Sequence, residues 1–168
     1  MPTPLNSHDE DVLQAERDIR DRLGHLPLDF PALTAISNVY RAATAVRNRI
    51  EREVLSTEGL SWGGFTILFV LWIWGPMEAA RLASECGLAK GTLTGMVSTL
   101  EGRGLVERDR LTADRRRVRI ALTESGLELI EKLFPAFNRV ESAVVGALEP
   151  DEADTLSRLL RRVIRKAE

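Results

Sequence analysis

The middle of the chain constrains the fold most, because two short helical segments are followed at once by two strand-like runs. The helical segments, 77–86 and 90–102, meet at a turn that contains Gly87. Apolar and polar residues then alternate over 105–108 and 117–122, which predicts a β-hairpin with the tip LTADRR. Helix, turn, helix and hairpin in this order are typical of a winged helix-turn-helix.

The flanking regions are predicted to be helical. Apolar residues there recur at three- and four-residue spacing, and capping residues stand at several of the ends. These helices are 7–23, 29–55, one that Ser61 caps and Gly75-Pro76 ends, one that starts at Thr123 and is kinked at Pro135, and one that follows Pro150. The sequence therefore predicts a mainly α protein with a small β-hairpin.

The formal charge is unevenly distributed along the chain. The whole chain carries −2, whereas residues 89–122 hold eight basic and four acidic residues and so carry +4. The rest of the chain therefore carries −6. One basic region on an acidic body is the electrostatic pattern expected of a nucleic-acid-binding protein.

The second central helix, 90–102, has one face without bulky side chains. Its apolar stripe is Leu93, Met96, Val97 and Leu100. Its outward face consists of Lys90, Gly91, Thr92, Thr94, Gly95, Ser98, Thr99 and Gly102. Glycine inside a helix costs about 1 kcal/mol relative to alanine, so these glycines need a cause other than stability. The two readings are close docking of the helix into a DNA major groove and a tolerated, weak surface helix.

Three consecutive arginines, Arg115 to Arg117, lie at the end of the predicted hairpin loop. Neighbouring like charges repel, so such a run needs solvent or an anionic partner. Core packing does not explain it, and Asp114 can pair with only one or two of the guanidinium groups. We therefore favour a polyanion over a solvated cluster, with Arg115, Arg116 or both in a minor groove or on phosphates. Arg110 belongs to the same basic region.

The centre of the chain resembles the MarR family of bacterial transcriptional regulators. The resemblance rests on the run LEGRGLVER at 100–108, on the wing pattern at Asp114 and Arg116, and on the ending LTESG at 122–126. It is close over 60–126 and looser over the flanking helices.

The resemblance implies a fold, an assembly and a role. The winged helix-turn-helix DNA-binding domain would span 58–123, and the helices of 1–57 and 124–168 would form a dimerisation region. It implies an obligate homodimer on a pseudo-palindromic operator of double-stranded DNA, most often as a repressor.

Candidate DNA contacts follow from the helix face, the hairpin and the resemblance together. They are Lys90, Gly91, Thr92, Thr94, Gly95, Ser98, Arg110, Arg115, Arg116 and Arg117. In the resemblance, the lysine and the hydroxyl residues correspond to recognition-helix contacts, and Arg116 corresponds to the wing arginine. Gly95 departs from the longer polar or basic side chain of many relatives, so sequence preference is expected to depend more on the wing and on DNA shape.

Two apolar seams are expected to be buried between two chains. They are Ile36, Val39, Ala43 and Ile50 in the second helix, and Leu156, Leu159, Leu160 and Val163 in the last one. Their spacing resembles that of a coiled coil, in which such a helix packs against another helix.

The aromatic residues Trp62, Phe69 and Trp72 have two interpretations. Core packing is the simpler one. Relatives have effector pockets between the dimerisation and DNA-binding regions, so the resemblance also implies a cavity for a small, aromatic effector that releases DNA.

Cys86, the single cysteine, lies on the apolar stripe of the first central helix. This position favours a packed core thiol over a redox switch. Two alternative functions stay open: a thiol-based redox sensor through Cys86, and a helical interaction protein that acts through a protein partner.

Other classes of site find little support in the sequence. His8 and His25 stand apart from any metal-ligand pattern, so no metal or cofactor is predicted. No catalytic triad, phosphate loop or carboxylate pair is recognisable, so an enzyme is not predicted. The longest apolar run, 65–74, is shorter than the ~20 residues of a membrane span, and no secretory signal is recognisable. A cytoplasmic protein is therefore expected.

Overall fold

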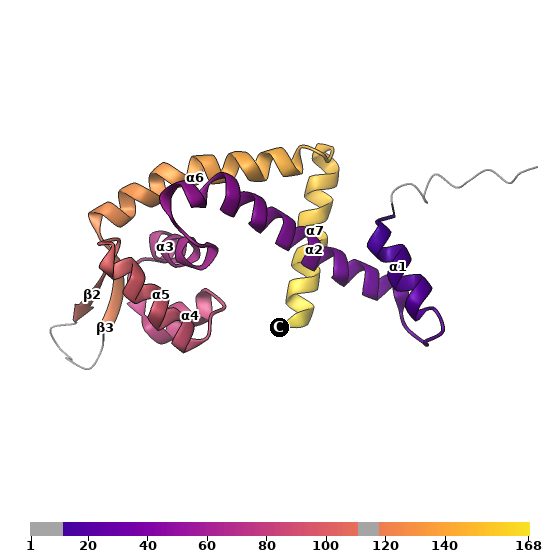
Figure 1. Ribbon diagram of the computed structural model, residues 1–168, viewed down its shortest axis with the longest axis horizontal. Coiled ribbons are helices and arrows are strands. Elements are labelled where there is room, and N and C mark those ends of the chain that lie inside the picture. The colour runs from indigo at the N-terminus through magenta and orange to yellow at the C-terminus, as the bar shows by residue number, and fades with distance from the viewer. Residues whose placement is uncertain (1–11, 111–117) are drawn as a thin grey trace, which may run out of the picture. The chain divides into compact units, whose positions relative to one another are not determined.

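The computed structural model describes residues 12–110 and 118–168 (Figure 1). Residues 1–45 and 46–168 form two compact units, which are described separately. The first unit holds α1 (Gln14–Leu23) and the first part of α2 (Phe30–Glu53). Within it, the Asn38 side-chain amide donates a hydrogen bond to Glu16 and links the two helices.

The second unit contains the end of α2 and all later elements. They are the 3-10 turn η1 (Leu55–Glu58), α3 (Trp62–Trp74), β1 (Met77–Glu78), α4 (Ala79–Glu85), α5 (Lys90–Gly102), β2 (Val106–Arg110), β3 (Val118–Leu122), α6 (Glu124–Val145) and α7 (Pro150–Ala167). The expected boundaries of the second central helix agree with α5. The expected start of the first helix at Ser7 lies outside the described residues.

Helix α3 begins and ends at the residues that its sequence predicts. The Ser61 hydroxyl accepts a hydrogen bond from the backbone N–H of Gly64 (3.2 Å), which satisfies one of the free donors of the first turn. The Glu51 carboxylate of α2 accepts a second one from the N–H of Trp62 (2.9 Å). At the other end Gly75 has a φ of +74°, a conformation that glycine adopts without strain.

The start of the helix-turn-helix differs from the sequence prediction. A helix was expected from Met77, but Met77 and Glu78 form β1, and α4 begins at Ala79. The reason is tertiary, since Met77 pairs with Ile120 in an antiparallel ladder. The hairpin is therefore part of a three-stranded sheet with the order β1-β3-β2.

Thr123 links the wing to the start of α6 by three hydrogen bonds. Its hydroxyl donates to the carbonyl of Gly104 (2.6 Å) and accepts from the N–H of Gly126 (3.0 Å). Its own N–H donates to the carbonyl of Leu105 (3.2 Å). The sequence LTESG therefore places the first turn of α6 directly against the start of β2.

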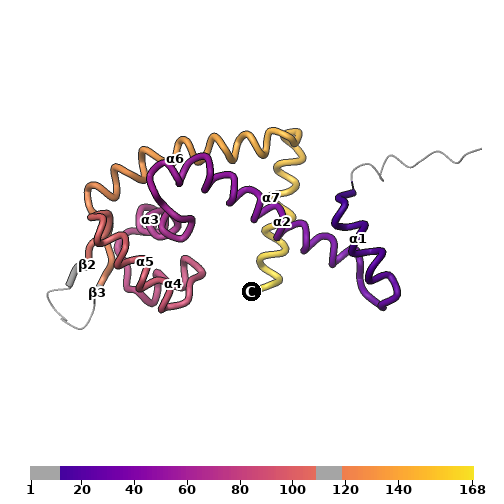
Figure 2. The backbone as a smooth tube through the Cα atoms, viewed as in Figure 1, coloured from indigo at the N-terminus to yellow at the C-terminus, as the bar shows by residue number. Residues whose placement is uncertain are grey.

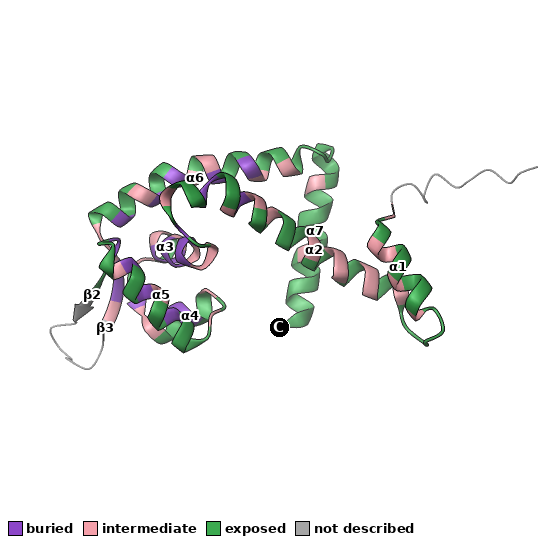
Figure 3. Ribbon diagram, in the orientation of Figure 1, coloured by how far each residue is buried: buried purple, intermediate pink, exposed green. Residues whose placement is uncertain are grey.

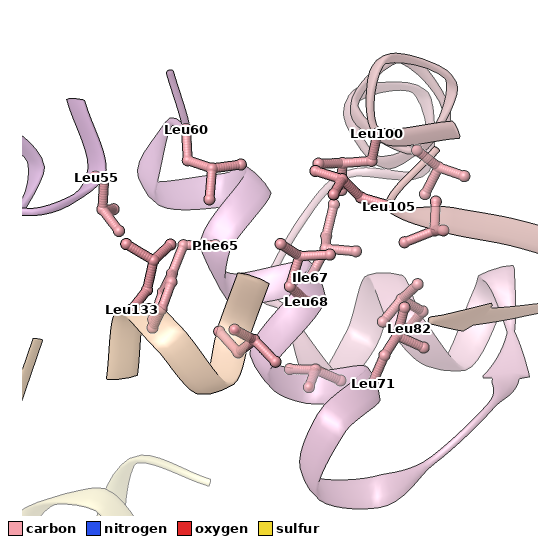
Figure 4. Close-up of a cluster of buried hydrophobic side chains, with 14 of the residues drawn as sticks. Leu55, Leu60, Phe65, Ile67, Leu68, Leu71, Leu82, Leu100, Leu105 and Leu133 are labelled. Atoms are coloured by element: carbon pink, nitrogen blue, oxygen red, sulfur yellow. The ribbon is translucent and has the colours of Figure 1, made fainter. Parts of the chain in front are cut away.

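The core of the second unit surrounds α3, whose side chains are buried on several sides. Figure 4 shows Phe65 against Leu133 of α6, with Ile67 and Leu68 directed towards the helix-turn-helix side. Leu82, Leu100 and Leu105 close the other side of the cluster. Burial of each such side chain stabilises the fold by about 1.5–3 kcal/mol, so α4, α5 and the sheet are fixed to α3 by apolar packing.

The long helix α6 continues as one helix through Pro135, the residue at which the sequence predicts a kink (Figure 2). After it, Pro150 occupies the first turn of α7, and Glu149 and Glu152 form a capping box. Proline fits this position because its missing N–H would have no helical partner there.

Several apolar residues of α2 and α7 are exposed in the single chain. They are Ile36, Val39, Leu156, Leu159 and Val163, each 37–44% exposed. Ile50 differs from them, because it is fully buried within its own chain. The expectation that Ile50 belongs to a seam between chains is therefore wrong, since the core of the second unit already covers it.

Candidate nucleic-acid interface

Helix α5 is held against the core by one face only. Leu93, Val97 and Leu100 are at most 3% exposed. The turn before the helix has Gly87 at a φ of +63°, and the N–H of Leu88 donates to the carbonyl of Ala83 (2.9 Å). Most of the other α5 residues are exposed, as the green segments of α5 in Figure 3 show, whereas Met96 and Glu101 are half-buried.

The candidate DNA contacts on α5 share one exposed face. Its members are Lys90, Gly91, Thr92, Thr94, Gly95 and Ser98. A Cβ atom on Gly91 or Gly95 would meet nothing within 4 Å. Packing within the described chain therefore does not require glycine at these two positions. Each glycine also weakens the helix by about 1 kcal/mol relative to alanine, so stability does not explain them either.

The hydroxyl groups on this face are not equivalent. Thr94 Oγ1 donates to the carbonyl of Lys90 (2.9 Å), and Thr99 Oγ1 donates to that of Gly95 (3.1 Å). A hydroxyl has one proton, so each threonine has only lone pairs and its methyl group left for an outside partner. Ser98 instead accepts a hydrogen bond, from Nη2 of Arg108 (3.3 Å).

Two arginines that the sequence did not single out fix α5 to its surroundings. Arg108, on β2, also forms an ion pair with Glu101 of α5 (3.2 Å). Arg103, just after α5, donates to the backbone carbonyls of Glu58 (2.7 Å) and Gly59 (3.0 Å). The only signal in the sequence was the spacing of basic residues in LEGRGLVER, which does not reveal their partners.

The wing carries the other predicted contacts. Strands β2 and β3 pair from Val106 opposite Leu122 to Arg110 opposite Val118, so the backbone of Arg110 lies at the end of the ladder. The side chain of Arg110 and the residues Arg115 to Arg117 lie outside the described part of the structure. Their assignment to DNA stays a prediction.

The aromatic residues proposed for an effector pocket lie in a ring cluster between α3 and α6. Trp62 lies 5.9 Å from Phe137, measured between ring centroids. Phe69 and Trp72 lie 5.6 and 5.4 Å from Phe134. Such distances are typical of favourable aromatic packing. The structure therefore places the three residues together on the side of α3 that faces α6. There their rings pack against Phe134 and Phe137 of α6.

Two of the pockets in the second unit lie elsewhere. One, of about 110 Å³, lies beside α5 and is lined in part by Leu60, Met96 and Arg103. The other, of about 300 Å³, lies between the end of α2 and α6 and is lined in part by Val54 and Arg139. Trp62, Phe69 and Trp72 line neither of the two.

Cys86 is half-buried at the end of α4 and packs against the core. Burial raises the pKa of its thiol from 9.0 to about 11, and the charge of Glu85 adds to the rise. Because the thiolate is the reactive form, this environment disfavours redox chemistry at neutral pH.

Within residues 12–110 and 118–168, no group of three or more His, Cys, Asp and Glu side chains is arranged to hold a metal ion. None of the helices there combines the length and the apolar character that crossing a membrane requires.

Comparison with known proteins places this geometry in a family. The sequence model of the MarR family matches residues 60–118. The HTH-type transcriptional regulator YwaE of Bacillus subtilis is 37% identical over 161 residues, which are 94% of each chain.

Solved structures confirm the winged helix-turn-helix fold. AbsC, a MarR family transcriptional regulator from Streptomyces coelicolor, has a TM-score of 0.73 at 23% identity, over 85% of this chain and 97% of that one. PcaV from Streptomyces coelicolor, in complex with its natural ligand, has a TM-score of 0.66 at 25% identity, over 87% of this chain and 96% of that one. By its sequence and its fold, the chain belongs to the MarR family of transcriptional regulators.

Proposed function

We propose that the chain binds a pseudo-palindromic operator as a homodimer and represses transcription, with the exposed face of α5 in the major groove. The proposed contacts on α5 are Lys90, Gly91, Thr92, Thr94, Gly95 and Ser98. Those on the wing are Arg110, Arg115, Arg116 and Arg117. The observation that carries this proposal is the exposed face of α5, where the space around Gly91 and Gly95 is unoccupied by the described chain. The basic wing sequence follows this helix directly.

The open glycines support close docking of α5. The major groove is about 12 Å wide and admits a helix, and small side chains let the helix backbone approach the base edges. The wing arginines would then lie over the adjacent minor groove, where the negative potential attracts guanidinium groups. Because DNA is the partner, we place the action of the protein in the bacterial cytoplasm.

The exposed apolar residues of α2 and α7 support a homodimer. Large apolar side chains of this number, arranged along helices, favour burial against another chain. A two-fold axis would present two α5 helices to two half-sites, which explains why a pseudo-palindrome is expected.

A small aromatic effector is part of the proposal. PcaV was solved in complex with its natural ligand, so a protein of this fold does bind a ligand. The cluster of Trp62, Phe69 and Trp72 supplies aromatic faces on α3, which packs against α5 in the same core. An effector that separated these rings would move α3 and with it the DNA-binding face.

Selection of bound sequences from a random DNA pool tests the proposal. We expect a two-fold symmetric consensus, bound with an affinity that falls as salt rises, with a log-log slope of about −0.9 per phosphate neutralised. The double variant Arg115→Ala, Arg116→Ala should bind DNA more weakly. Its total log-log slope should be less negative, because fewer phosphates are neutralised, while sedimentation and helical content stay unchanged. A protein that selected no DNA sequence would contradict the proposal and favour the interaction-protein alternative.

A further inference from the structure

Arg108 forms a bridge between the wing and the DNA-facing side of α5. It projects from β2, and its guanidinium group reaches Ser98 Oγ (3.3 Å) and Glu101 Oε2 (3.2 Å). These two partners lie three residues apart on α5 and therefore on neighbouring turns of one face. The side chains of Arg108 and Glu101 are 40% and 37% exposed, so the bridge lies at the surface beside the proposed contacts.

The bridge determines what the Ser98 hydroxyl can offer to DNA. An arginine only donates, so it occupies a lone pair of Ser98 Oγ and leaves the serine proton available. Thr94 and Thr99 differ, because their protons are already bonded to helix carbonyls. Among the described residues, no carbonyl takes the proton of Ser98.

We propose that Arg108 is a positioning residue for sequence reading: it holds Ser98 as a hydrogen-bond donor towards an acceptor on a base edge. The acceptors that the major groove offers are purine N7, guanine O6 and thymine O4. This inference rests on the proposed docking of α5 into that groove.

The ion pair with Glu101 argues against a phosphate as the main partner of Arg108. The Glu101 carboxylate already balances the guanidinium charge. A phosphate at the same place would bring a second anion next to Glu101, and like charges at short distance repel. Arg108 therefore masks the charge of Glu101 and orients Ser98.

The test uses a pair of substitutions that leaves the net charge unchanged. Arg108→Met with Glu101→Gln removes one positive and one negative charge, so general attraction to DNA is preserved while Ser98 loses its donor. The measurement is the relative affinity of the selected operator and of all its single-base variants. We expect this double variant and Ser98→Ala to lose preference at the same base pair by about 3- to 10-fold, the range for one neutral hydrogen bond.

Two further variants separate positioning from general stabilisation. Adding Ser98→Ala to the double variant should cause no further loss, because both changes remove the same contact. Arg108→Lys keeps a donor and the positive charge at this position. It should therefore retain more of the base preference than the Arg108→Met, Glu101→Gln double variant. A purely structural role would instead lower affinity for all sequences alike.

A matched control exists on α2. Arg49 and Glu53 form an ion pair of similar length (3.1 Å) and exposure (41% and 40%). Arg49→Met with Glu53→Gln makes the same chemical change away from α5 and should leave the base preferences unchanged.

The outcomes distinguish this inference from the function on which it rests. If the wild type selects no sequence, the proposed function itself fails. If the wild type is specific but the charge-neutral double variant keeps every base preference, or loses affinity uniformly, Arg108 does not position Ser98 and the inference is overturned.

Discussion

A Cβ atom on Gly126 would lie 2.0 Å from the carbonyl oxygen of Leu105. The first turn of α6 is therefore in direct contact with the backbone that enters β2, and no side chain fits between them. Gly126→Ala must therefore push the backbones of α6 and Leu105 apart. Overpacking of this kind lowers the free energy of unfolding by about 1–3 kcal/mol. We expect a lower midpoint in urea unfolding, measured at equal protein concentration.

Gly91→Ala is the control for this change, because a Cβ atom there meets nothing within 4 Å. It should leave the unfolding free energy unchanged or raise it by up to about 1 kcal/mol. Equal stability of Gly126→Ala and the wild type would show that α6 does not approach Leu105 so closely.

Gly95 should be needed for DNA binding and not for folding. Its Cβ direction is open, so Gly95→Ala should raise the unfolding free energy by up to about 1 kcal/mol. Gly95→Leu should fold as well but hold α5 away from the bases, so specific operator binding is lost while non-specific binding by the arginines persists. Unfolding curves and operator titrations measure both effects. Full operator affinity of Gly95→Leu would mean that this face does not enter the groove.

Leu159→Asp should separate the proposed dimer. The leucine is 43% exposed in the single chain, and a charge in an apolar interface is costly to bury. Sedimentation at micromolar concentration should then show a species of 18.7 kDa. Arg161→Asp serves as the control, because Arg161 is two residues and therefore about 200° further around α7, and it should leave the assembly intact. A wild type that already sediments as a monomer would refute the homodimer.

Cys86 should react slowly with iodoacetamide at neutral pH. Its pKa is raised from 9.0 to about 11, so at pH 8 the folded protein holds roughly 100-fold less thiolate than the unfolded chain. Because the folded state keeps the thiol proton to a higher pH than the unfolded chain does, the stability of the fold should fall as the pH rises from 9 to about 11. Alkylation rates against pH, compared with those in urea, measure the effect. Rapid alkylation at pH 7 would reopen the redox-sensor alternative.

The sequence predicted those parts of the fold whose signals are local. The ends of α5, the Ser61 cap and the proline start of α7 depend on nearby residues, and the structure places them as expected. The two-residue strand β1 was missed because Met77 becomes a strand only through its pairing with Ile120.

The candidate site shows the same division. The exposed face of α5 could be predicted from helical spacing, because one stripe of the helix is apolar. The link from Arg108 to Ser98 could not, since it depends on how β2 packs beside α5. Ile50 was misassigned for a related reason: an apolar residue on a helix has the same spacing whether its own core or a second chain covers it.

The composition of α5 has a consequence for conformational entropy. The helix has 13 residues, three of them glycine, and isolated helices of this length are marginal in water even with good helix formers. A peptide of residues 90–102 would therefore be largely unfolded, and α5 is helical only because Leu93, Val97 and Leu100 are buried. The entropy lost in ordering this helix is thus compensated by core packing during folding, and DNA meets a surface that is already ordered.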